Sequence, residues 1–69
     1  KMSLNAFLLN LGLQEYRDIL ISHGFVSLQD LMVITEEDLA RLHFKLGHRR
    51  KLQRGIATFE GRPNWEPLF

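Results

Sequence analysis

The chain has only 69 residues and contains no cysteine, and this combination limits how it can fold. A chain of this length has room for one small domain, which buries only about 60% of the surface that the unfolded chain exposes. Disulfides and thiolate metal sites stabilise many small domains, but both need cysteine. Apolar packing must therefore supply the stability, and the hydrophobic fraction of 45% is typical of a globular domain.

Apolar residues recur at helical spacing in the first third of the chain. The first stripe consists of Leu4, Phe7, Leu8 and Leu11. It follows Ser3, a suitable N-cap, and stops at Gly12, a suitable C-cap. A second stripe predicts a helix from about Leu13 to His23, with Gly24 as its C-cap.

The middle of the chain carries the same helix-start signal twice. Ser27 and Thr35 are each followed three residues later by an aspartate, Asp30 and Asp38. In such a capping box the hydroxyl accepts a backbone N–H, and the acid suits the positive end of the helix. The pattern predicts two short helices, one after Ser27 and one after Thr35.

The last helix is expected to be the longest, from about Leu46 to Glu60, because Gly61 and Pro63 end its pattern. The positions expected to face the core are Leu52, Ile56 and Phe59. No segment alternates as a strand would, and no Asn-Gly or Asp-Gly hairpin turn is present. The predicted fold class is all-α: a compact five-helix bundle with a longer C-terminal helix.

The sequence predicts one helical domain over residues 1–61 and a short tail over residues 62–69. Because exposed aromatic side chains are costly in water, the tail is expected to dock onto the domain through Trp65; the alternative is a free linker or partner-binding segment. The longest apolar run, residues 31–34, is far too short to cross a membrane, and no signal peptide precedes it. We therefore expect no transmembrane segment and an intracellular location, in cytoplasm or nucleus.

Candidates for catalysis or metal binding are few. Ser22 and His23 are neighbours, and adjacent helical residues point about 100° apart, so their side chains are not expected to face each other. The three histidines, at positions 23, 43 and 48, stand without cysteine or an H-E-x-x-H spacing. No phosphate-binding glycine motif is present. The sequence predicts no enzyme, no small-molecule substrate, no metal and no other cofactor.

Charge is balanced in total but divided along the chain. The net charge is +1, which argues against a surface that binds nucleic acid throughout. Residues 13–40 contain six acids and one base, a net charge of −5, whereas residues 41–62 contain seven bases and one acid, a net charge of +6. Oppositely charged patches can attract further copies head to tail, and such contacts form open filaments when no ring closes. The alternative is that both are solvated helix faces.

The start of the last helix breaks a local rule. A helix N-terminus is partially positive, so basic residues there cost a few tenths of a kcal/mol each. The basic residues around Gly47 are Lys45, Arg49, Arg50 and Lys51. A broken local rule often marks a site, so this cluster is predicted to bind an anionic group. On a helical wheel Arg50 and Arg54 point away from the core, and His48 lies near its edge.

These features resemble the sterile alpha motif (SAM) family over about residues 4–60. The strongest pieces are the acid-rich turn Thr35-Glu36-Glu37-Asp38-Leu39 and the helix start Gly47-His48-Arg49. The chain departs from the family pattern at two positions, since many relatives carry tryptophan where Phe7 stands and glycine where His43 stands.

The resemblance implies a non-enzymatic protein–protein interaction module that associates head to tail, with itself or with another SAM domain. An acidic mid-loop surface then falls on Asp30, Glu36, Glu37 and Asp38. A basic end-helix surface falls on Lys45, Gly47, His48, Arg49, Arg50 and Lys51. The division of charge agrees with these two surfaces. The alternative is RNA-hairpin binding through the basic helix start, which a few relatives with a Gly-x-Arg-Arg-Lys-Leu start use; the acidic middle counts against it.

Overall fold

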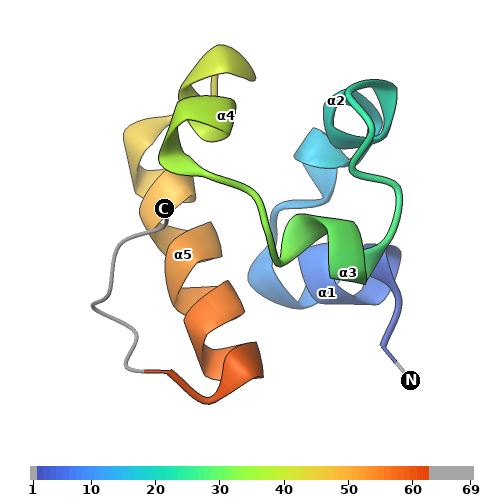
Figure 1. The fold of residues 1–69 in the computed structure, drawn as a ribbon, viewed down its shortest axis with the longest axis vertical. Helices are drawn as coiled ribbons and strands as arrows, with labels where there is room; N and C mark the ends of the chain where they lie inside the picture. The colour runs from blue at the N-terminus through green and yellow to red at the C-terminus, as the bar shows by residue number, and fades with distance from the viewer. Residues whose placement is uncertain (1, 63–69) are drawn as a thin grey trace. The chain divides into compact units, whose positions relative to one another are not determined.

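The computed structural model describes residues 2–62. These residues form five α-helices and one short 3-10 helix, with no strand among them: α1 (Leu4–Leu11), η1 (Gln14–Tyr16), α2 (Arg17–Ser22), α3 (Leu28–Leu31), α4 (Glu36–Arg41) and α5 (Leu46–Glu60) (Figure 1). The predicted all-α fold with five helices, the longest of them last, is confirmed. The chain divides into two units, of which the first ends at Val33 and the second begins at Ile34.

In the first unit, α1 contacts η1, α2 and α3. The predicted caps of α1 are confirmed: the Ser3 hydroxyl accepts the Ala6 N–H at 3.1 Å, and Gly12 adopts a left-handed conformation, with φ of 70°. The side chains that α1 buries are Leu4, Phe7 and Leu8. They belong to a core that also includes Leu13, Tyr16, Leu20, Leu28 and Leu31.

The helix predicted from about Leu13 to His23 begins later than predicted, while its end is confirmed to within one residue. The Leu13 N–H donates to the Leu8 carbonyl at 2.8 Å, which ties Leu13 to the C-cap of α1. The chain therefore makes the 3-10 turn η1 first, and α2 begins only at Arg17. At the other end the C-cap is His23, and Gly24 follows it with φ of 94°.

Both predicted capping boxes are present. The Ser27 hydroxyl accepts the Asp30 N–H at 3.0 Å, while the Asp30 carboxylate accepts the Ser27 N–H at 3.2 Å. At the start of α4, the Thr35 hydroxyl accepts the Asp38 N–H at 3.1 Å and the Asp38 carboxylate accepts the Thr35 N–H at 3.0 Å. These reciprocal bonds satisfy backbone donors that a helix N-terminus otherwise leaves open, so α3 and α4 form despite their shortness.

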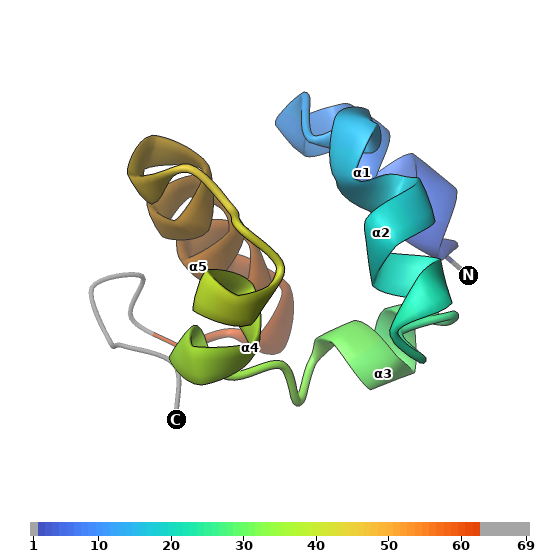
Figure 2. The same cartoon turned by 90° about the horizontal axis from the view of Figure 1, so that it is seen from above.

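In the second unit, α4 lies beside the beginning of α5 (Figure 2). The predicted bounds of α5 are confirmed, as is the burial of Leu52 and Ile56, both 0% exposed. Phe59 is 50% exposed, so its predicted core position is wrong; Ala57 is buried instead. Helical spacing identifies a face of a helix, but not how far along the helix that face stays covered. The predicted boundary at residue 61 and the docking of Trp65 stay predictions, since residues 63–69 lie outside the described part.

His43, between α4 and α5, has a φ of 63°, a left-handed conformation that costs most side chains free energy. Replacing His43 with glycine is expected to raise the free energy of unfolding by about 0.5–1 kcal/mol, because glycine adopts this backbone without steric cost. Urea denaturation followed by circular dichroism measures the change. The exposed helical substitution Ala40→Gly is the control and should lower stability by about 1 kcal/mol. An equal decrease in the free energy of unfolding in both variants would contradict this explanation.

Candidate functional site

The start of α5 concentrates positive charge. Lys45 is the N-cap, its side chain makes no capping hydrogen bond, and the first turn contains no acid. The partial positive charge of the helix end therefore adds to that of the basic side chains. At Gly47 a Cβ atom would meet nothing within 4 Å, so the surface there is open to a partner.

The basic residues of α5 divide between two faces. Arg50, Lys51 and Arg54 are exposed, and none of them forms an ion pair within residues 2–62. The predicted outward direction of Arg50 and Arg54 agrees with this exposure. Arg49 differs, because Leu52 and Ile56 follow it at i+3 and i+7 and both are buried. Its side chain is only 26% exposed.

Two of the four predicted mid-loop residues serve the local fold. The carboxylate of Asp30, in the first unit, accepts the backbone N–H groups of Val26 and Ser27 at 3.0 and 3.2 Å. Asp38, in the second unit, closes the capping box of α4, and Arg41 Nη1 lies 3.5 Å from its Oδ1. Asp30 therefore belongs to a different unit from the three other predicted acids, and both aspartates are already hydrogen-bonded.

Among the four acids of the predicted mid-loop surface, Glu37 is the most available to a partner. Its side chain is 85% exposed, and its ion pair with Arg41 is loose, with 3.9 Å between Nη2 and Oε2. An exposed i,i+4 pair of this kind contributes about 0.3–0.5 kcal/mol. Such a contact is easily exchanged for one with another molecule.

The structure brings together one residue from each predicted surface. Arg49 Nη1 lies 4.0 Å from Glu36 Oε1, and both side chains are partly buried, with exposed fractions of 26% and 39%. Arg49 Nε and Glu36 Oε2 are fully buried and have no hydrogen-bond partner. This internal contact is not predicted from the sequence; the position of Arg49 three residues before Leu52 signals that its side chain is partly buried, but not that Glu36 contacts it.

The histidines form no metal centre within residues 2–62, where no group of three metal-ligating side chains occurs. His48 is partly buried, in keeping with its predicted place near the core edge. The expectation that Ser22 and His23 do not meet is wrong: Ser22 Oγ lies 3.2 Å from His23 Nδ1. Both groups also contact the Ile19 carbonyl oxygen, at 2.9 and 3.0 Å, because that carbonyl is open at the end of a helix as short as α2.

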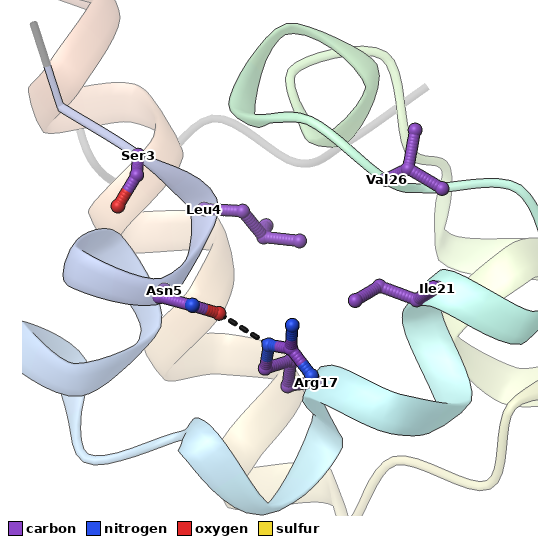
Figure 3. Close-up of a pocket in the computed structure, with 6 residues that line it drawn as sticks. All are labelled: Ser3, Leu4, Asn5, Arg17, Ile21 and Val26. Carbon is purple, nitrogen blue, oxygen red and sulfur yellow. Dashed lines mark hydrogen bonds between the residues drawn. The ribbon is translucent and has the colours of Figure 1, made fainter.

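A pocket of about 150 Å³ opens in the first unit, between the start of α1 and the two ends of α2. Figure 3 shows the residues that line it: Ser3, Leu4, Asn5, Arg17, Ile21 and Val26. Arg17 donates from Nε to the Asn5 side-chain oxygen, and its Nη1 lies 3.2 Å from the Asp18 carboxylate. The cation of the pocket is thus already paired.

None of the described helices is long and apolar enough to span a membrane.

Comparison with known proteins identifies one match. A family model described as SAM domain (Sterile alpha motif) matches residues 1–60, which include every residue of both predicted surfaces. Neither a curated protein nor a solved structure matches the chain.

Proposed function

Since the chain belongs to the sterile alpha motif family, whose members are generally non-enzymatic protein–protein interaction modules, we propose that it associates head to tail with itself or with another SAM domain. In this arrangement the basic end-helix surface of one molecule contacts the acidic mid-loop surface of the next. Because the two contacting surfaces differ, every dimer keeps one of each unoccupied, and chains grow unless a ring closes.

The observation that carries this proposal is exposed charge of both signs in the second unit. Arg50 and Lys51 are exposed and lack an ion pair in the described part of the chain, while Glu37 is 85% exposed and only loosely paired. Complementary charge of this kind raises the rate of encounter and selects the partner more than it raises affinity.

Sedimentation velocity across a wide concentration range tests the proposal. The wild type is expected to grow in size with concentration, whereas Glu37→Lys and Arg50→Glu should each stay monomeric because each removes one surface. An equimolar mixture of the two variants should stop at a dimer, since only one intact pair of surfaces remains. Higher salt should weaken every contact, because the charges are exposed.

Glu15→Lys is the matched control, because it makes the same change of charge at an exposed acid of η1 in the first unit. It should associate like the wild type. A wild type that stays monomeric would exclude self-association, and the same variants would then be mixed with other SAM domains. Growth of both surface variants like the wild type would overturn the choice of surfaces.

RNA-hairpin binding is the second candidate, because the exposed cations Arg50 and Lys51 stand at an uncapped helix start whose N–H groups also suit phosphate. The Glu37→Lys variant separates the two functions. Under the RNA function it keeps or improves its affinity for a labelled hairpin, whereas under head-to-tail association it loses its ability to polymerise.

A further inference from the structure

The cations of α5 are not equivalent in what they offer a partner. Arg49 is partly buried on the helix face that carries Leu52 and Ile56, whereas Arg50 and Arg54 are exposed, although the buried Ala57 follows them at i+7 and i+3. The end-helix surface predicted from the sequence includes Arg49 and omits Arg54. The burial of the side chains favours the opposite choice, a surface that includes Arg54 and omits Arg49.

Arg49 is partly buried inside the second unit, next to Glu36. Its Nη1 lies 4.0 Å from Glu36 Oε1, and its Nε is buried without a hydrogen-bond partner, as is Glu36 Oε2. A partner carboxylate that took Arg49 would leave the partly buried Glu36 without this counterion, at a cost that its 39% exposure keeps modest. Docking through Arg49 therefore carries a cost that docking through the exposed Arg50 or Arg54 does not.

Arg50, Lys51 and Arg54 form a continuous exposed stripe along α5. Arg54 is at i+4 from Arg50 and at i+3 from Lys51, so the three side chains are neighbours on the helix surface. The stripe is bordered by the small exposed residues Gly47 and Thr58, three residues before Arg50 and four after Arg54. Like charges at this spacing repel one another, and an acidic partner relieves that repulsion.

We propose that the docking surface of α5 is the stripe Arg50, Lys51 and Arg54, that it receives the exposed Glu37 side of a second copy, and that Glu36 keeps Arg49 out of the contact. This proposal rests on the head-to-tail association proposed above. It places the partner along the side of α5, not at the tip of the helix.

Isothermal titration calorimetry with a single interface tests the stripe. One component carries Glu37→Lys and keeps only its basic surface; the other carries Arg50→Glu and keeps only its acidic surface. Adding Arg54→Gln to the first component should raise Kd about fivefold or more, the loss expected for one ion pair between molecules. Adding Arg49→Gln removes the same charge from the same helix and should change Kd less than about twofold.

The double variant Glu36→Gln/Arg49→Gln controls for a loss of stability in Arg49→Gln, because it removes both charges of the internal pair and leaves neither unpaired. It should keep the dimer affinity within about twofold. The stripe is wrong if Arg49→Gln and this double variant weaken the dimer fivefold while Arg54→Gln does not. If the two components do not dimerise at all, the head-to-tail proposal itself fails and the stripe fails with it.

Hydrogen exchange of the arginine Nε protons, followed by NMR on the monomeric Glu37→Lys variant, checks the placement of Arg49 without any partner. The Nε proton of Arg49 should exchange several-fold more slowly than those of Arg50 and Arg54, because Arg49 Nε is buried whereas Arg50 and Arg54 are exposed residues. Equal exchange at all three arginines would overturn the claim that Arg49 is withheld.

Discussion

Leu52→Ala is expected to lower the free energy of unfolding by about 2–5 kcal/mol and so to unfold most molecules. Leu52 is 0% exposed and stands at the centre of the buried face of α5. Truncation removes buried apolar surface and leaves a cavity that the surroundings fill only partly. A core this small supplies a total stability of roughly 3–5 kcal/mol, so the loss is comparable to the whole. Urea denaturation followed by circular dichroism measures the change.

Leu46→Ala is the matched control, because it makes the same change in the same helix at a side chain that is 55% exposed. Its effect on stability should stay below about 1 kcal/mol. If the two leucine variants were equally stable, the assignment of Leu52 to the core of the second unit would be wrong.

Asp38→Ala is expected to lower the free energy of unfolding by about 1–2 kcal/mol, although it removes a residue first predicted to lie on a docking surface. Its carboxylate accepts the Thr35 N–H at 3.0 Å, and its loss leaves that donor without a partner. The 3.5 Å contact with Arg41 is lost as well, at a further cost of at most about 0.5 kcal/mol. Thermal and urea denaturation both measure the loss.

Glu37→Ala is the control for Asp38→Ala, because it removes an acid from the same turn of α4. Glu37 makes no capping bond, so its loss should cost less than about 0.5 kcal/mol. Its effect should instead appear in sedimentation, as weaker self-association of a fully folded protein. A Glu37→Ala variant as unstable as Asp38→Ala would show that the two acids share one structural role.

The parts of the fold that were readable in the sequence are those decided within a few residues. Ser27 and Thr35 each bond to the aspartate three positions later, so both capping boxes followed from spacing alone. Gly61 ends α5 with φ of 73° for a similarly local reason. The start of α2 could not be predicted in this way. The Leu13 N–H donates to a carbonyl of α1, and the helix propensity of residues 13–23 contains no information about that hydrogen bond.

In the candidate site, too, local features could be predicted from the sequence and tertiary contacts could not. Counting charges identifies the basic start of α5 and the acidic turn of α4 but does not distinguish Arg49 from Arg50, although the helical wheel points Arg50 away from the core. Burial separates them, since Arg49 contacts Glu36 and Arg50 is exposed without an ion pair among residues 2–62. The spacing from Arg49 to Leu52 suggests the difference, yet the pairing with Glu36 depends on how α4 lies beside α5.

The left-handed backbone at His43 has a consequence for how the docking surface can evolve. Any histidine codon becomes an asparagine codon through one change of its first base, and asparagine is, after glycine, the residue that ends helices most readily in this conformation. A single mutation at this position thus offers added stability, which would compensate a destabilising exchange elsewhere. The domain could then tolerate destabilising substitutions among the charged residues of α5, and with them a change of partner, that its small stability would otherwise not allow.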